Sequence, residues 1–153
     1  MTDKVIEFKG KVIGKVSGLV DETSVTIAIY GEDLDPDDIS RQLGCQPTFS
    51  HRQGERRSHG SPPYKQGAWF LEVKGNAPHG PEDLTKALLM RLPADETIWV
   101  ELARKYDIQM RYGIHMDTWN RGFELSPKLV QRISKLHAKL SFDIYAVGEN
   151  DDA

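Results

Sequence analysis

The greatest concentration of chemically useful side chains lies in the stretch FSHRQGERRSHG, residues 49–60, which contains three arginines, two histidines and two glycines. Arginine presents a planar fork of donors that suits carboxylates and phosphates, and glycine lets a backbone approach a ligand closely. A crossover made soluble by its charge is the plainer explanation, although loops on a rigid scaffold often carry binding residues. The stretch therefore predicts an ordered loop that recognises an anionic group through Arg52, Arg56 and Arg57.

A second candidate site lies on two segments that alternate apolar and polar residues, DIQMRYGIHMD at 107–117 and LSFDIYAV at 140–147. Alternation indicates half-buried strands, so the polar side chains share one open face. The proposed binding residues on that face are Arg111, His115, Asp143 and Tyr145. Asp117 and Glu72 are expected on the same face, with Thr26, Tyr30 and Phe70 nearby. A merely solvated face is the alternative; if both candidates are real, the loop folds over this face and forms one cleft.

The sequence argues against three other kinds of site: a calcium loop, a reactive thiol and a metal site. The acidic run DLDPDD at 33–38 lacks the calcium-loop spacing and is explained as a helix start. Cys45 follows a helix stop, so no helix dipole lowers the pKa of its thiol. The five histidines and Cys45 contain no helical i, i+4 pair and no CxxC pair. We therefore predict no metal, no cofactor and no catalytic residue.

The elements that must position these residues can be read from caps and periodicity. Proline at the first helical position after an acidic or hydroxyl residue predicts helix starts, and the expected helices cover 35–44, 80–92, 94–106 and 125–140. Pro93 breaks or kinks the second of these. The expected strands cover 24–31, 67–74, 107–117 and 140–147. The inward rows of the last two strands are Ile108, Met110, Tyr112, Ile114 and Met116, then Leu140, Phe142 and Ile144. Trp99 is expected to be buried against the sheet.

Alternating strands favour a mainly antiparallel sheet with helices on one face and water on the other. The predicted fold is a single α+β domain with four or five strands, of the ferredoxin-like kind. LDPDDISR at 34–41 and LSPKLVQR at 125–132 share a pattern and each lies between two strands. They suggest two related β-α-β units, with coincidence as the alternative. Residues 1–20 are expected to form an arm or hairpin, 21–148 the domain, and 149–153 an acidic tail.

The composition limits where the protein acts and what it binds. With 153 residues and a single cysteine, one domain without an internal disulfide is expected, and a reducing, cytoplasmic compartment is favoured. The chain shows neither a signal-peptide pattern nor an apolar run of membrane-helix length. Its net charge of −3 at pH 7 argues against a generic nucleic-acid binder, although residues 45–66 are locally basic.

The order of several motifs resembles a known family. IAIYGEDLDPDDISRQLGCQPT, an Arg/Gly loop, GAWFLEV and LSPKLVQRISKLHAKLSFDIYAV together resemble a bacterial family, domain of unknown function 4279, over about residues 24–147. The matching positions are Gly31, Leu34, Pro36, Ile39, Leu43, Gly44, Pro47, Gly54, Trp69, Leu125, Ser126, Leu136, Asp143 and Tyr145. The resemblance supports the fold and carries no established activity. Some members look like toxin-immunity neighbours, which implies a binding role.

We therefore predict a non-enzymatic cytosolic binding module, immunity-like in kind, for an unknown protein or small anionic ligand. One alternative is a small enzyme with a cleft between the loop and the sheet face, in which His115 and Asp143 transfer a proton. The other is a dimerisation module that pairs through a sheet edge or face. Either a monomer or a homodimer is compatible with the sequence.

Overall fold

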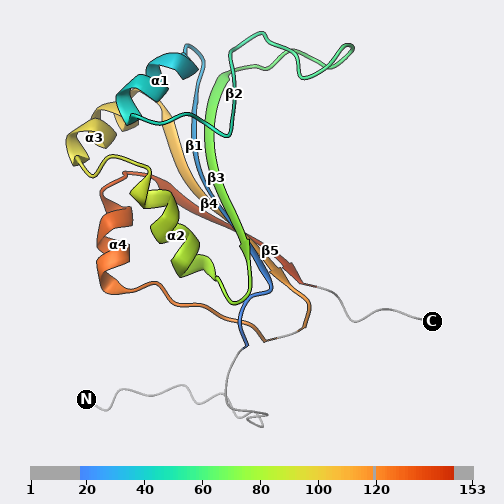
Figure 1. The fold of residues 1–153 in the computed structure, drawn as a ribbon. Coiled ribbons are helices and arrows are strands. Elements are labelled where there is room, and N and C mark those ends of the chain that lie inside the picture. The colour runs from blue at the N-terminus through green and yellow to red at the C-terminus, as the bar shows by residue number, and fades with distance from the viewer. Residues whose placement is uncertain (1–17, 119, 147–153) are drawn as a thin grey trace, which may run out of the picture.

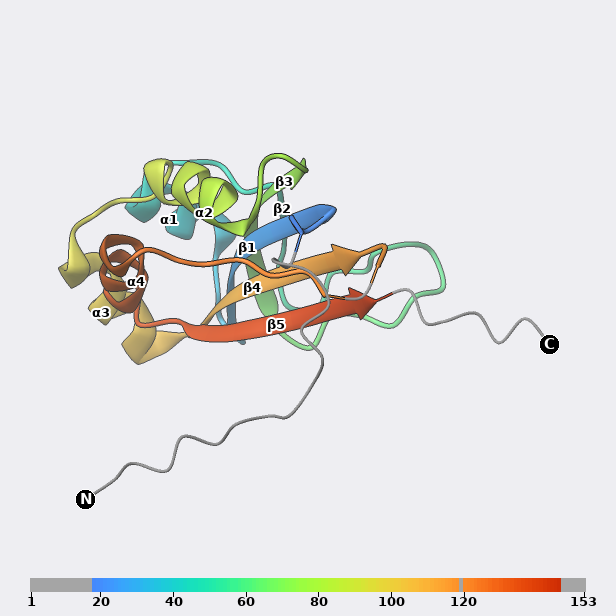
Figure 2. The same cartoon turned by 90° about the horizontal axis from the view of Figure 1, so that it is seen from below.

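The computed structural model describes residues 18–118 and 120–146 as an α+β fold, a mixed, mostly antiparallel sheet of five strands with four helices on one side (Figures 1 and 2). In chain order the elements are β1 Glu22–Gly31, α1 Pro36–Leu43, β2 Phe49–His51, β3 Gly67–Asn76, α2 Pro81–Met90, α3 Glu96–Lys105, β4 Asp107–Met116, α4 Pro127–Ser134 and β5 Lys139–Ala146. The predicted α+β class and the mainly antiparallel sheet of four or five strands with helices on one side are thereby confirmed.

The strands are arranged in the order β2-β3-β1-β4-β5. β1 lies at the centre and pairs antiparallel with both β3 and β4 along its length. β2 pairs antiparallel with β3, whereas β5 runs parallel to β4. The parallel pair follows from α4, which carries the chain back to the start of β4 before β5 begins. β2 and β5 are therefore the two edges of the sheet.

The helices begin where the caps predicted. Asp35 accepts a hydrogen bond from the Asp37 amide at the start of α1, and Gly44 ends that helix in the left-handed region at φ 70°. Ser126 accepts from the Leu129 amide at the start of α4. α2 and α3 are separate helices because Pro93 interrupts them.

The core lies between the helices and one face of the sheet. Val25, Ile27 and Ile29 of β1 are fully buried there, as predicted. Trp69 on β3 and Trp99 on α3 are the largest fully buried side chains in the described residues. Each indole N–H has an acceptor: Trp69 donates to the Ser40 hydroxyl at 3.0 Å and Trp99 to the Pro93 carbonyl at 2.9 Å. Both bonds offset the cost of burying a polar group.

Three predictions about elements were wrong. Leu140, Phe142 and Ile144 face the helix side but stay exposed, because β5 is an edge and the helices lie toward its N-terminal end (Figure 2). α4 ends at Ser134 instead of running to 140, and His137 then adopts a positive φ of 51°. Residues 49–51, predicted as loop, form the edge strand β2.

The finer topology is not confirmed. α4 connects β4 and β5, which are parallel neighbours, whereas α1 connects β1 and β2, which run in the same direction but are separated in the sheet by β3. The ferredoxin-like arrangement and the kinship of two β-α-β units stay predictions. The predicted arm at 1–20 lies outside the described residues up to residue 17, and the acidic tail lies outside them altogether. None of the helices described has the length and hydropathy of a membrane span.

Candidate functional site

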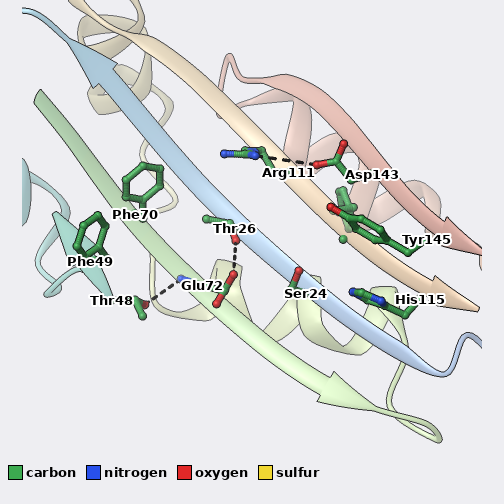
Figure 3. Close-up of a pocket in the computed structure, with 12 residues that line it drawn as sticks. Ser24, Thr26, Thr48, Phe49, Phe70, Glu72, Arg111, His115, Asp143 and Tyr145 are labelled. Carbon is green, nitrogen blue, oxygen red and sulfur yellow. Dashed lines mark hydrogen bonds and ion pairs between the residues drawn. The ribbon is translucent and has the colours of Figure 1, made fainter. Parts of the chain in front are cut away.

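The open face of the sheet contains a pocket of about 510 Å³, to which every strand contributes (Figure 3). Side chains on the open face alternate with the buried row because neighbouring residues of a strand point to opposite sides. The pocket is lined by Ser24, Thr26, Thr48, Phe49, Phe70, Glu72, Arg111, Tyr112, Gly113, His115, Asp143 and Tyr145. Four of the predicted site residues are therefore together in one place: Arg111, His115, Asp143 and Tyr145.

The pocket is hollow because its central residues are small. Ser24 of β1 is the partner of Gly113 of β4 in the sheet register. A Cβ placed on Gly113 would come within 2.5 Å of the Ser24 Oγ, so a larger residue there would fill the floor. Glycine within a strand often marks such a close approach. Ser24, Gly113 and Thr26 therefore form a low polar floor between taller neighbours.

Aromatic rings form the wall on the β2 and β3 side. Phe49 stacks on Phe70 with ring centroids 5.8 Å apart, and Tyr30 meets Phe70 edge-on at 5.5 Å. Such offset and edge-to-face pairs are the favoured aromatic geometries. On the opposite side, the His115 ring stacks on Tyr145 at 4.7 Å. The two ring groups give the pocket apolar walls above a polar floor (Figure 3).

Arg111 is the pocket's cation. Its Nη1 donates to the Tyr30 hydroxyl at 3.1 Å, and its Nη2 lies 4.0 Å from an Asp143 carboxylate oxygen. The second distance is an ion pair and too long for a hydrogen bond. Because a guanidinium has five N–H donors and this side chain is 43 % exposed, the group is oriented by its neighbours and keeps donors for a ligand.

Glu72 already has partners. Its carboxylate accepts from the Thr26 hydroxyl at 3.2 Å and forms an ion pair with Lys74 at 3.2 Å. The Glu72 amide donates to the Thr48 hydroxyl at 3.0 Å, which ties β3 to the residue before β2. The lining therefore contains one arginine and two carboxylates, of which Glu72 is partly neutralised from outside the pocket.

The arginine-rich loop is built differently from the pocket. Its backbone doubles back, since the Gly54 and Tyr64 amides donate to the Tyr64 and Glu55 carbonyls, both at 2.8 Å. The His51 ring stacks on Tyr64 with centroids 3.5 Å apart, and burial lowers the pKa of His51. The loop projects beyond the end of the sheet on the side away from the helices (Figure 1).

Two of the three loop arginines already have ion-pair or hydrogen-bond partners in the same chain. Arg52 Nη2 lies 2.8 Å from Asp35 and 2.9 Å from Asp37, at the start of α1. Desolvation acts to raise the pKa of Asp35, but hydrogen bonds from the Asp37 amide and from Arg52 outweigh it, so that pKa is lowered. Arg56 donates to the Ser61 carbonyl at 2.9 Å, and Arg57 is exposed. None of the three lines the pocket; of the predicted loop stretch 49–60, Phe49 alone does so.

Catalytic and metal chemistry finds little support among the described residues. Asp143 pairs with Arg111 and His115 stacks on Tyr145, and no hydrogen bond joins His115 to Asp143. Burial raises the pKa of the Cys45 thiol, with Arg91 acting in the opposite direction, so the reactive thiolate is scarce. Residues 18–118 and 120–146 contain no group of three or more potential metal ligands among His, Cys, Asp and Glu.

Several pocket residues escaped the sequence reasoning. Ser24, Thr48, Phe49 and Gly113 line the pocket, but none was singled out beforehand. Gly113 offered a signal, because it interrupts the polar row of an otherwise regular strand. Phe49 and Thr48 offered none, since only tertiary pairing shows that the chain enters the sheet there.

This geometry defines a class of α+β protein: helices cover one face of the sheet, and the other face is open and contains a pocket. The chain belongs to the family described as Domain of unknown function (DUF4279), which it matches over residues 21–147. No curated protein and no solved structure matches the chain.

Proposed function

We propose that the protein is a non-enzymatic cytosolic binding module whose site is the open-face pocket, and that it recognises a carboxylate through Arg111. The proposal rests on the Arg111 guanidinium, which its neighbours orient while some of its N–H donors stay available, inside a pocket of about 510 Å³. That volume is typical of small-molecule sites. A small anionic ligand is therefore favoured over a large protein surface.

The charges of the pocket narrow the ligand class. Asp143 and Glu72 lie in the same lining as Arg111, so a doubly charged phosphate meets two like charges for one opposite charge. A single carboxylate suffers less repulsion, and a hydrogen-bond donor on the same molecule would satisfy Asp143. A small ligand with one carboxylate and a neighbouring donor, such as an amino-acid-like zwitterion, fits this arrangement.

The aromatic walls add a second requirement. Rings on both sides of the floor offer apolar contact to a flat or aliphatic part of the ligand. The alternative of a small enzyme would use His115 and Asp143 for proton transfer. Their contacts with Tyr145 and Arg111 instead of each other favour binding.

The loop arginines play a lesser part in this proposal. Arg52 and Arg56 are engaged by groups of the chain itself, which leaves Arg57, of these three arginines, for a larger anionic partner. The short basic stretch and the negative total charge predict no tight, steeply salt-dependent binding of duplex DNA. A fluorescence anisotropy titration at physiological salt checks this expectation.

The test is a ligand-observed NMR screen of the full chain with small carboxylates, phosphates and neutral fragments. Carboxylates with an adjacent donor are expected to bind, and Arg111→Ala should weaken them roughly tenfold or more, as expected for a charge-assisted contact. Arg104→Ala is the matched control, because Arg104 is exposed on α3 and its ion-pair partner among the described residues is Glu101. Equal loss in both variants, or a preference for phosphates, would refute the proposal.

A further inference from the structure

The two edges of the sheet differ in length and in cover. β2 is three residues long and continues into the folded loop, whereas β5 is eight residues long. Within the described residues, β5 pairs with β4 on one side and with no strand on the other. A long edge presents a row of N–H and C=O groups ready to pair with another strand. Short edges, prolines and lysines normally prevent this, and β5 has only Lys139, at its first position.

The same strand exposes an apolar row. Leu140, Phe142 and Ile144 are 43 %, 45 % and 62 % exposed. They are the register partners of Met110, Tyr112 and Ile114 on β4, which the helices bury. Exposed apolar side chains on an unpaired edge mark an interaction surface, because single exposed residues are common but a contiguous row is not.

We propose that the outer edge of β5 pairs antiparallel with β5 of a second copy of this chain, giving a homodimer with one continuous sheet. A two-fold dimer brings the same strand to both sides of the contact, and a two-fold axis perpendicular to the sheet makes the pairing antiparallel. A second copy is the occupant that the sequence of the strand itself selects, through its register and its charges.

The register follows from which residues must be opposite one another. Residues directly opposite each other across an antiparallel ladder have side chains on the same face of the sheet. The apolar rows of the two copies therefore meet only if the two-fold axis passes between one residue and the same residue of the second copy. An axis at Phe142 pairs residues 139–145 with residues 139–145 of the second copy and places Leu140 opposite the partner's Ile144. An axis at Asp143 would oppose two carboxylates, and an axis at Ser141 would keep only residues 139–143 paired within the strand.

The charges agree with an axis at Phe142. On the open face Asp143 is then opposite the partner's Ser141, and Tyr145 is opposite the partner's Lys139. Diagonal neighbours lie about 7–8 Å apart and remain within reach of long side chains, so Lys139 also approaches the partner's Asp143. No like charges are directly opposed, and the strand is complementary to its own copy.

This dimer also changes the pocket. Asp143 and Tyr145 form its β5 side, and both lie on the face that the partner's Lys139 shares. The second copy therefore adds a cation to the rim of a pocket in which Arg111 is the one arginine or lysine among the described lining residues. The pairing itself rests on the edge geometry and stands whether or not the pocket binds a ligand.

The test measures the mass of the full chain by sedimentation velocity over a range of concentrations. The wild type is expected to dimerise, and Phe142→Asp and Phe142→Lys should each raise the dimer dissociation constant at least tenfold by opposing like charges. Mixing the two variants should restore a heterodimer, because the introduced charges then oppose each other. Only an axis at Phe142 predicts this rescue.

The matched control is Phe49→Asp on the other edge, since Phe49 is also an exposed edge phenylalanine, at 51 %. It should leave the dimer unchanged. Phe142 stacks on Tyr112 at 5.1 Å, so Ile144→Glu, which lies nearer the strand's end, serves as a second variant if Phe142 variants unfold; it should also weaken the dimer. A monomeric wild type, a dimer that Ile144→Glu leaves intact, or one lost in Phe49→Asp instead would overturn the proposal.

Discussion

The two faces of the sheet are made from the same strands but have opposite compositions. On β1, Val25, Ile27 and Ile29 are fully buried under helices, while Ser24 and Thr26, which alternate with Val25 and Ile27, line the open pocket. The covered face is apolar with two tryptophans, and both indole N–H groups have hydrogen-bond partners inside the chain. The open face combines small, charged and aromatic side chains. Stability therefore depends on one face and recognition on the other, so substitutions on the two faces should have separable effects.

The largest expected effect lies in the covered face. Trp99→Ala removes a fully buried indole from between α3 and the sheet, and the cavity should cost about 3–5 kcal/mol of unfolding free energy. Urea titration followed by circular dichroism measures the loss. A loss below about 1 kcal/mol would mean that the helix layer supports the sheet less than this structure implies.

A buried hydrogen bond on the same face gives the next largest effect. Ser40→Ala removes the acceptor of the Trp69 N–H, which then remains buried without a partner. An unsatisfied buried donor costs about 1–3 kcal/mol. The control is Ser58→Ala, at an exposed loop position, for which no more than about 0.5 kcal/mol is expected. Equal losses from the two variants would be inconsistent with a buried, satisfied indole.

The loop should matter less for stability than either buried position. Arg52→Ala removes the ion pairs with Asp35 and Asp37, and exposed pairs of this kind contribute about 0–1 kcal/mol. Arg57→Ala should change stability by less than about 0.5 kcal/mol. Thermal melts at low and high salt provide the measurement, because salt should shrink the Arg52 effect alone. The expectation fails if Arg57→Ala destabilises more than Arg52→Ala.

The open face should also show only a small effect on stability. Arg111→Ala is expected to change the free energy of unfolding by no more than about 1 kcal/mol, since its ion pair with Asp143 is exposed. Its effect should appear in ligand affinity instead. Urea titration of Arg111→Ala beside Trp99→Ala makes the comparison between the faces direct. A loss of stability similar to that of Trp99→Ala would contradict the division between the faces.

Much of the fold could be predicted because its signals are local. Alternation assigned Ile108, Met110 and Tyr112 to the covered face, and the cap residues Asp35 and Ser126 placed two helix starts. The neighbours of a strand are not local information. Leu140, Phe142 and Ile144 have the pattern of a buried row, and only the position of β5 at the edge leaves them exposed.

The candidate site was predicted only in part, because some of its signals are local and others depend on which segments lie side by side in the fold. Arg111 and His115 were placed on the open face from alternation alone. The loop arginines were given equal weight because composition does not show that Asp35 and Asp37, fifteen or more residues earlier, lie beside Arg52. The hollow at Gly113 depends on its pairing with Ser24, which no property of either residue alone determines.

The most direct test of the central claim is where small ligands bind on the full chain. Amide chemical shifts of the isotope-labelled protein, followed during titration with the carboxylate fragments that bind in the screen, locate the contact by residue. The account predicts shifts that cluster at Ser24, Thr26, Gly113 and Asp143 and disappear in Arg111→Ala. Shifts that cluster in residues 52–66 and persist in that variant would contradict it and return the function to the arginine-rich loop.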